Sequence, residues 1–393
     1  MFPTMGGQMK AILRWTAALY LCCASTVAFA GKLPGGTGVS FLVGYNEAWF
    51  GPNYGNSIAS NPSVFCVPSS FDPIFVEKMF AGMQAGGAKV VRIWVFPALQ
   101  GIQLSTACPI APPPAPPPQT MRLTNDLKGN LQTVFTKARN HGLKVYVTAL
   151  NGGDMQVAST NITGLNSYFQ NLLTDTSEMT RFQQNVLGPL VDLLNATAPD
   201  GSRNRDVIYA LDLINEIQAP LTSHYPNFGW TQAQAWIKNM TDFVKSRPCG
   251  AGCVTGSWLP VTSSSWSVSD ITVGLFSGLH LDFYDVHVYA DWGQYSGVTW
   301  LCNRVSADGV PIILGEYGQK THTFDDGLQY STTSNFLTTA KAHCFSAALA
   351  WMYETKCDPR FPGCPSQGYD WWTYLIPSGP DAGKFRPAYS LIH

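Results

Sequence analysis

Short apolar stretches alternate along the chain with segments in which apolar residues keep helical spacing. A short apolar run bounded by turn residues is typical of a strand that is buried on both faces. Eight such runs are found, at 39–46, 88–96, 143–150, 207–214, near 257–264, and at 282–289, 310–314 and 347–353. The pattern therefore predicts eight strands, with segments of a different periodicity between them.

Most of these intervening segments are predicted to be helices. Asp72 can cap a first turn and Pro73 suits it, so one helix begins there and runs to about Gly86. A second helix keeps its apolar spacing from Leu127 to Ala138 and ends at Gly142. The same reading predicts helices near 182–194, 231–246, 296–306, 333–345 and 387–392. The crossover after the fifth strand shows no clear helical pattern.

Strands that alternate with helices predict a parallel α/β sheet. Eight of them favour a closed (β/α)8 TIM barrel, a single domain over 31–393 with long loops at its C-terminal face. The alternative is an open doubly wound sheet, although neither a GxGxxG motif nor a P-loop follows the first strand. We interpret the proline-rich run 111–119 as a loop after the second strand, because the alternation continues beyond it.

Residues 1–30 resemble a secretory signal peptide. Lys10 and Arg14 precede a short apolar core, and Ala28-Phe29-Ala30 is a typical small-x-small cleavage site. The apolar core is too short for a comfortable membrane span, and no later stretch is long and apolar enough to cross a bilayer. These features predict a secreted protein with no membrane association.

Cysteine usage is consistent with export. Eight of the ten cysteines lie beyond the signal segment, and an even number in a secreted chain suggests disulfides whose pairing the sequence leaves open. Pairing between neighbours is the simplest arrangement: 66–108, 249–253, 302–344 and 357–364. A zinc site is disfavoured because the cysteines lack paired CxxC spacing and nearby histidines. Asn161, Asn195 and Asn239 lie in glycosylation sequons.

Composition narrows the class of ligand. The 393 residues carry a formal net charge of −1, and only 12% are charged while 12% are aromatic. This balance argues against nucleic acid, which needs a basic face. Few charges and many Trp and Tyr suit a neutral, hydroxyl-rich ligand, although a large core with aromatic filler explains them equally well.

Two carboxylates occupy matching positions on opposite strands. Asn215 and Glu216 follow the apolar run 207–214, and Glu316 follows the run 310–314 after a single glycine. Chemistry in a barrel sits at the C-terminal ends of the strands, and strands four and seven face each other across the mouth. Paired carboxylates are what glycosidic bond cleavage requires. A single strand-end Glu is more often a surface salt bridge, but a matched pair is hard to explain in that way.

Other polar residues fall on neighbouring strands. Arg92 interrupts the second strand and needs an anion, for which Glu316 and Asp212 are the candidates. His287 and Tyr289 are two apart on the sixth strand and so face the same way. Trp351 ends the eighth strand, where it could stack on a sugar ring or plug the barrel.

These motifs together resemble the clan A glycoside hydrolases, and glycoside hydrolase family 5, the cellulase and mannanase family, most closely. The resemblance covers nearly the whole mature chain in the right order: Arg on strand two, Asn-Glu on four, His-x-Tyr on six, Gly-Glu on seven and Trp on eight. It implies the following roles: Glu216 as acid/base, Glu316 as nucleophile, Asn215 as the residue binding the sugar 2-hydroxyl, Arg92 and Tyr289 as partners of Glu316, and His287 and Trp351 as lining of the subsite.

The chain departs from the family pattern at two places. Family 5 usually reads Asn-Glu-Pro, whereas Ile217 follows Glu216 here. Many members carry a His after strand three, where this chain offers Asn151 and Asp154. A second Asn-Glu pair ends strand one, and we interpret Glu47 as a binding residue at most because it does not face strand seven.

The sequence thus predicts a secreted, monomeric, retaining β-glycosidase that hydrolyses a neutral polysaccharide, a β-mannan or β-glucan. It implies no metal and no organic cofactor. A positive Arg92 should lower the pKa of Glu316, and an ionised Glu316 should raise that of Glu216. Two alternatives remain open: a cell-wall glucan transglycosylase with the same residues, and a glycan-binding barrel without catalysis.

Overall fold

The computed structural model describes residues 41–51, 53–104, 121–161, 163–221, 225–248, 259–289, 297–319, 326–354, 373–375 and 383–392. The predicted signal peptide, residues 1–30, and the proline-rich run 111–119 lie outside these residues, so the predictions made for them stay predictions. Within the described ranges, no helix combines the length and the apolar character needed to cross a membrane.

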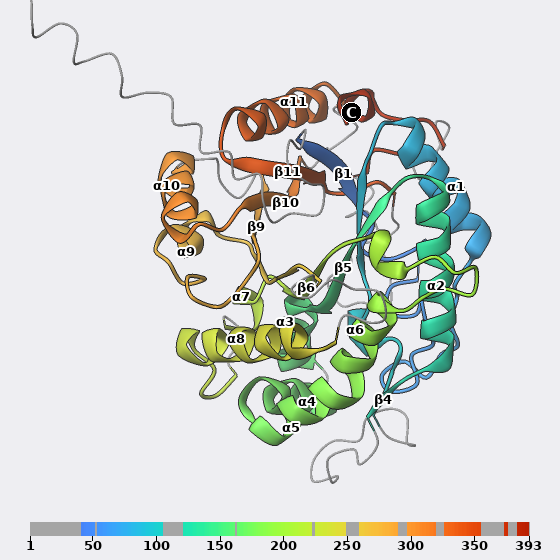
Figure 1. The fold of residues 1–393 in the computed structure, drawn as a ribbon, viewed down its shortest axis with the longest axis vertical. Helices are drawn as coiled ribbons and strands as arrows, with labels where there is room; N and C mark the ends of the chain where they lie inside the picture. Colours follow the sequence, from blue (N-terminus) through green and yellow to red (C-terminus); the bar gives the residue numbers. More distant parts are fainter. Residues whose placement is uncertain are drawn as a thin grey trace, which may run out of the picture.

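A parallel sheet forms the centre of the molecule (Figure 1). Its strands lie in the order β7-β6-β5-β2-β1-β11-β10-β9-β8. The bounds are β1 Leu42–Asn46, β2 Val90–Trp94, β5 Lys144–Asn151, β6 Ile208–Asn215, β7 Val261–Thr262, β8 Ser264–Ser265, β9 Tyr284–Tyr289, β10 Ile312–Gly318 and β11 Phe345–Ala350.

The sheet closes on itself through the segment 261–265. Its first half, β7, pairs with β6, and its second half, β8, pairs with β9 on the other side. Only Ser263 separates the two halves, so they occupy one strand position. The result is a (β/α)8 barrel, which confirms the predicted fold and each of the eight predicted strands to within a few residues.

Helices surround the barrel, and most of the predicted ones are present (Figure 1). The side chain of Asp72 accepts a hydrogen bond from the backbone N–H of Ile74, and this cap begins α1 (Pro73–Ala85) as predicted. The others are α2 Asn125–Asn140, α5 Thr176–Phe182 continuing through a π turn into α6 Gly188–Asn195, α8 Trp230–Ser246, α10 Val298–Asp308, α11 Asp326–Ala342 and the 3₁₀ helix Pro387–Leu391. The crossover after the fifth strand holds only a short helix, α9 (Val268–Thr272).

The segment that follows β5 is more ordered than its sequence suggests. No helix was predicted between the strand at 143–150 and residue 182, but the chain forms α3 (Gly152–Asn161) and α4 (Thr163–Thr174) there. A short helix, α7 (Gln218–Leu221), also follows β6. The strands β3 (Ile102–Gln103) and β4 (Arg122–Leu123) pair antiparallel on the two sides of the proline-rich run.

The barrel interior changes from apolar to polar toward its C-terminal end. Val90, Tyr146 and Phe283 belong to one buried cluster near the N-terminal ends of the strands. Two residues further along the same strands, the buried side chains are Arg92, Thr148 and Asp285, because residues two apart on a strand face the same way. The core therefore ends in a layer of buried polar groups.

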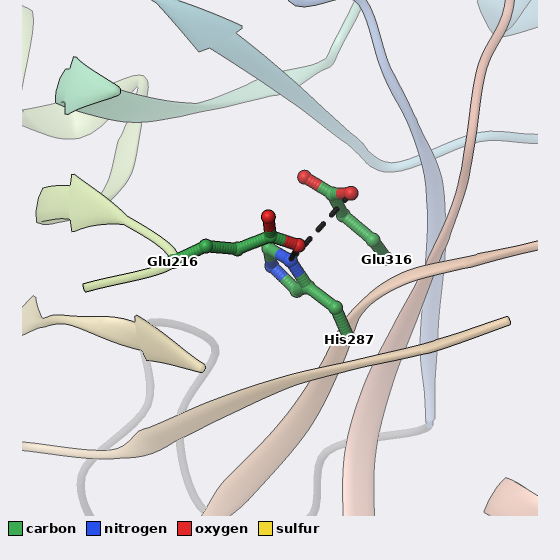
Figure 2. A group of neighbouring side chains, drawn as sticks. All are labelled: Glu216, His287 and Glu316. Carbon is green, nitrogen blue, oxygen red and sulfur yellow. Dashed lines mark hydrogen bonds and ion pairs between the residues drawn. The ribbon is translucent and has the colours of Figure 1, made fainter. Parts of the chain in front are cut away.

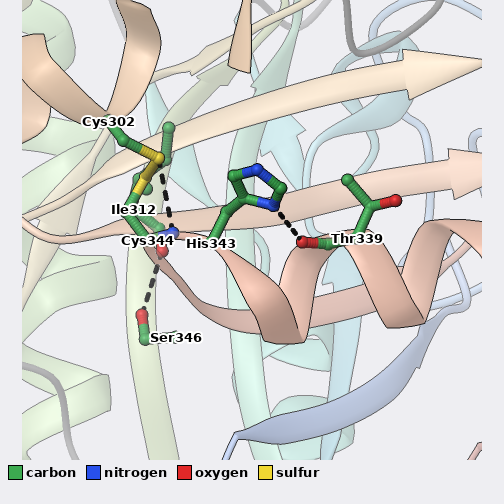
Figure 3. The surroundings of a disulfide bond; sticks show 6 residues. All are labelled: Cys302, Ile312, Thr339, His343, Cys344 and Ser346. Atoms are coloured by element: carbon green, nitrogen blue, oxygen red, sulfur yellow. Dashed lines mark hydrogen bonds between the residues drawn. A yellow bond between two sulfur atoms is a disulfide. The ribbon is translucent and has the colours of Figure 1, made fainter. Parts of the chain in front are cut away.

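One disulfide among the described residues confirms the neighbour-pairing prediction. Cys302 in α10 is bonded to Cys344, just before β11, with their Cα atoms 5.5 Å apart (Figure 3). The backbone N–H of Cys344 donates to the Cys302 Sγ at 3.3 Å. Cys66 is also disulfide-bonded. Its predicted partner Cys108, and the pairs 249–253 and 357–364, fall outside the described residues.

Candidate active site

Glu216 and Glu316 meet across the C-terminal mouth of the barrel, as predicted (Figure 2). One oxygen of each carboxyl group and one ring nitrogen of His287 all lie within 4.8 Å of one another. The Nδ1 atom of His287 is 2.8 Å from Glu216 Oε1 and 3.5 Å from Glu316 Oε2. The His287 ring therefore bridges the two carboxyl groups.

The backbone turns sharply to present Glu216. This residue follows β6 directly and has a positive φ of 51°, which ends the strand. Its N–H donates to the Ser264 hydroxyl at 3.1 Å. Gly152, at the start of α3, passes so close that a Cβ there would lie 2.4 Å from the Glu216 carbonyl oxygen. The unusual conformation is thus held from two neighbouring segments.

A bulge in β10 presents Glu316. The register between β10 and β9 shifts between Leu314 and Glu316, leaving Gly315 as the extra residue. A Cβ on Gly315 would lie 1.8 Å from Asp285 Oδ1, so only glycine fits there. The Nδ2 of Asn46 donates to the Gly315 carbonyl at 2.9 Å. Bulges re-aim side chains next to active sites, and this one directs Glu316 inward.

Arg92 lies at the centre of the site and is fully buried. It donates to Glu316 Oε1 through one terminal nitrogen, which also reaches Asn46 Oδ1 at 3.1 Å. Its other terminal nitrogen donates to Asp212 Oδ2 at 2.7 Å and to Asn215 Oδ1 at 2.8 Å. Both anionic partners considered for Arg92 are therefore real, and the guanidinium joins strands β2, β6 and β10.

Tyr289 holds the second oxygen of Glu316. Its hydroxyl donates to Glu316 Oε2 at 2.5 Å. Arg92 and Tyr289 together bind both carboxylate oxygens of Glu316, which fixes the direction of the side chain. The sequence prediction that these two residues act on Glu316 agrees with this geometry.

The pKa of Glu216 is raised to about 7. Burial is the main cause, the positive charge of Arg92 opposes it, and the negative charge of Asp212 adds to it. The predicted direction is correct, but the predicted cause, an ionised Glu316, is not the dominant one. Removing a carboxyl group from water has the larger effect.

The pKa of Glu316 is also raised, which contradicts the predicted lowering. Burial raises it, while the charges of His287 and Arg92 and the Tyr289 hydrogen bond lower it. The positive charge of Arg92 does act in the predicted direction, but the cost of removing the carboxylate from water is larger. Burial likewise lowers the pKa of His287, although the charges of Glu316 and Asp285 act in the opposite direction.

Trp351 lies in a compact aromatic cluster beside the carboxylates. Its ring centroid is 5.6 Å from that of Trp94 and 6.4 Å from that of Trp49. Tyr289 and Tyr54 belong to the same buried group. Trp351 is only 6% exposed, so little of its ring is open to solvent.

The Asn-Glu pair at the end of β1 contributes to the site through Asn46, for which no role was predicted. Asn46 contacts Arg92 and Gly315, whereas Glu47 reaches Arg92 only by donating its backbone N–H to the Arg92 carbonyl. Glu47 is fully buried and accepts a hydrogen bond from the Glu354 N–H at 3.0 Å. Burial raises its pKa well above the ordinary value. The alternation of β1 could have identified Asn46 as facing inward.

The donor set of Glu216, His287 and Glu316 could in principle hold a metal ion. The environment does not fit one. Both Glu316 oxygens already accept hydrogen bonds from Arg92 and Tyr289, and the guanidinium already supplies a positive charge to Glu316. The cluster is better described as two carboxyl groups that share a histidine.

Compared with family models and with curated protein sequences, the chain matches none. Solved structures do resemble it. The endo-1,4-β-mannanase from Rhizomucor miehei superimposes with a TM-score of 0.58 at 16% identity, covering 90% of this chain and 94% of that one. The β-1,4-D-mannanase from Cryptopygus antarcticus gives 0.56 at 16% identity, covering 91% and 98%. An exo-β-1,4-mannosidase from Opitutaceae bacterium strain TAV5 gives 0.62 at 14% identity, covering 92% and 60%. At these identities the likeness shows a shared fold.

Proposed function

We propose that the protein is a secreted, retaining β-glycosidase that hydrolyses a neutral polysaccharide. The observation that carries the proposal is the meeting of Glu216 and Glu316 within 4.8 Å, with His287 between them. Retaining glycosidases hold their two carboxyl groups about 5–5.5 Å apart, whereas inverting ones need roughly 6.5–9.5 Å to admit a water.

Glu316 acts as the nucleophile in this mechanism. Arg92 and Tyr289 hold both of its oxygens, which stabilises the carboxylate and aims it at the anomeric carbon. Attack forms a glycosyl ester on Glu316 and breaks the bond to the leaving oxygen.

Glu216 acts first as the acid and then as the base. With a pKa of about 7 it keeps a proton in weakly acidic and neutral solution and passes it to the departing oxygen. Esterification removes the negative charge of Glu316, so Glu216 releases protons more readily afterwards. It then accepts a proton from the water that hydrolyses the ester.

A β-mannan is the first substrate to test. The three structural neighbours described above are named as β-1,4-mannanases and an exo-β-1,4-mannosidase, which supports this choice over β-glucan. A panel of mannans, β-1,4-glucans and β-1,3-glucans, assayed for released reducing ends, tests it. Release from no member of the panel would contradict the proposal.

Glu316→Gln tests the assignment of the nucleophile. The substitution keeps the size of the side chain and removes the carboxylate, so turnover should fall by a factor of at least about 10³ while circular dichroism and melting temperature stay native. Near-normal turnover in this variant would refute the role given to Glu316.

The two alternative functions use the same barrel. A transglycosylase would pass the Glu316 ester to a sugar acceptor rather than to water, and product analysis with added oligosaccharide would reveal longer chains. A binding protein without catalysis has no need for two acids held on one histidine. The raised pKa of Glu216, caused by burial, favours an enzyme over that reading.

A further inference from the structure

A row of hydrogen bonds leads away from the site through the position where many family 5 members carry a histidine. Asn215 Nδ2 donates to Asn151 Oδ1 at 3.2 Å, and Asn151 Nδ2 donates to the Tyr54 hydroxyl at 2.9 Å. The Tyr54 hydroxyl donates in turn to Asp154 Oδ1. The other oxygen of Asp154 accepts from the Ala98 N–H at 2.7 Å.

The direction of every bond in this row is determined. Arg92 can only donate, so the oxygen of the Asn215 amide must face it. The Asn215 nitrogen then faces Asn151, whose oxygen also accepts from the Gly153 N–H at 3.1 Å. The row therefore runs head to tail from a guanidinium to a carboxyl group, an arrangement in which neighbouring bonds strengthen each other.

The far end of the row is well anchored. Asp154 and Asn151 are buried, and the ring of Trp49 packs edge-on against Tyr54 at 4.8 Å. Burial raises the pKa of Asp154 to about 6, while the hydrogen bonds from Tyr54 and Ala98 favour its ionised form. Above that pH the carboxylate therefore accepts the Tyr54 hydrogen. Tyr54, Ala98 and Asn151 come from the loops or strand ends after β1, β2 and β5, so the row joins the C-terminal ends of three neighbouring strands.

The near end leaves one hydrogen for a ligand. The amide nitrogen of Asn215 carries two hydrogens, and within the described residues only Asn151 accepts from it. Because its oxygen faces Arg92, Asn215 presents this remaining N–H hydrogen as a donor for a sugar hydroxyl.

We propose that Tyr54, Asn151 and Asp154 are positioning residues that hold the Asn215 amide so that its N–H donates to the sugar 2-hydroxyl. This inference rests on the proposed function and adds residues to the same site. None of the three touches the reacting atoms; they act through Asn215.

The test compares substrates with and without the 2-hydroxyl. The probes are the 4-nitrophenyl β-glycosides of mannose and glucose, and their common 2-deoxy analogue, 4-nitrophenyl 2-deoxy-β-D-arabino-hexopyranoside. In Tyr54→Phe, kcat/KM for the 2-hydroxy substrate should fall about tenfold, the effect of one buried hydrogen bond to a charged group. The kcat/KM for the 2-deoxy analogue should change less than about twofold. The ratio of kcat/KM between the 2-hydroxy and the 2-deoxy substrate should therefore fall.

Tyr284→Phe is the matched control. The Tyr284 hydroxyl also donates to a carboxylate, Asp308 Oδ2 at 2.8 Å, but it stands at the opposite end of the barrel, at the start of β9. This variant should keep the wild-type ratio between the two substrates. Asn151→Ala should narrow the ratio at least as much as Tyr54→Phe.

Equal losses on both substrates in Tyr54→Phe would mean a merely structural role and would overturn the inference. The proposed function would still stand if Glu316→Gln is inactive. A calorimetric titration removes the dependence on turnover: noeuromycin carries the 2-hydroxyl and isofagomine lacks it. Tyr54→Phe should weaken binding of the first only, and equal weakening of both would again contradict the role.

Discussion

Glu216 and Glu316 are the same side chain in two different environments. Glu316 is held by a guanidinium, a phenol and a nearby imidazole, all of which favour its charged form. Glu216 has His287 as its hydrogen-bond partner, and the negative charge of Asp212 disfavours its ionised form. When the two share one proton, it therefore resides on Glu216, which gives the pair its division of labour.

Glu216→Ala should separate the two chemical steps. A 2,4-dinitrophenyl glycoside needs no acid, so the glycosyl ester should still form, but without a base its hydrolysis should slow by a factor of about 10²–10⁴. Added azide should restore turnover and give a β-glycosyl azide, detected by thin-layer chromatography. A variant that azide does not rescue would contradict the acid/base assignment.

The pH profile should report the same residue. Because the acid form of Glu216 is required, kcat/KM should fall as pH rises through the pKa of about 7. Stopped assays from weakly acidic to alkaline pH would show this limb, and in Glu216→Ala with a dinitrophenyl substrate the limb should disappear. A basic limb that persists in the variant would assign it to another group.

At the scale of the element, the glycines around the site explain how ordinary strands present these side chains. Gly315 forms the bulge in β10 and lies against Asp285, while Gly152 lies against the carbonyl of Glu216. In both places backbone or a buried carboxyl group occupies the space where a side chain would be. The regular strand geometry is therefore interrupted at the positions that carry the two carboxylates.

Gly315→Ala should damage both stability and activity. Its new Cβ would lie 1.8 Å from Asp285 Oδ1, so β9 or β10 must shift, and overpacking of this kind costs about 2–3 kcal/mol. Urea unfolding measures the stability and the aryl glycoside assay the activity.

Gly129→Ala is the control for that substitution. A Cβ at Gly129, inside α2, would meet nothing within 4 Å, so stability should stay the same or rise slightly. Equal stability of the two variants would show that the close approach at Gly315 does not constrain the strand.

How much of the structure the sequence can predict also differs from one element to the next. The eight strands and the cap at Asp72 could be predicted because apolar runs and capping residues are local signals. Glu216, Glu316 and Arg92 could be placed together because strand ends in a barrel share one face. Helices α3 and α4 were missed, since the segment 152–174 has weak apolar periodicity at its start.

The pKa of Glu316 and the role of Asn46 needed the structure itself. Both depend on the balance of burial, charge and bulge geometry among residues far apart in the chain. The hydrogen bonds from Asn151 to Tyr54 and Asp154 likewise join separate loops, and no spacing in the sequence indicates them.

At the scale of the whole molecule, the part that the structure describes buries more acidic side chains than basic ones. Besides Glu216, burial raises the pKa of Asp285 and of Asp154 to about 6. A buried acid with a raised pKa keeps a proton that the unfolded chain releases, so its contribution to stability is lost as pH rises. The window runs from the ordinary values near 4 up to about 7.

The melting temperature should therefore be higher at pH 5 than at pH 7.5, and scanning calorimetry in matched ionic strength measures it. The hydrogen bond from Lys137 lowers the pKa of Glu77 and acts in the other direction, but Glu77 is solvent-exposed and screened. Asp285→Asn removes one titrating group and should flatten the dependence. A melting temperature that rises toward pH 7.5 would contradict this account of the core.

The most direct test of the central claim is to trap the intermediate. Incubation with the 2,4-dinitrophenyl 2-deoxy-2-fluoro-β-glycosides of mannose and glucose, followed by peptide mass spectrometry, should find one fluoroglycosyl group, attached to Glu316. Glu316→Gln should acquire none. An enzyme that turns over its substrate yet carries the label on another residue, or carries no label at all, would contradict the account.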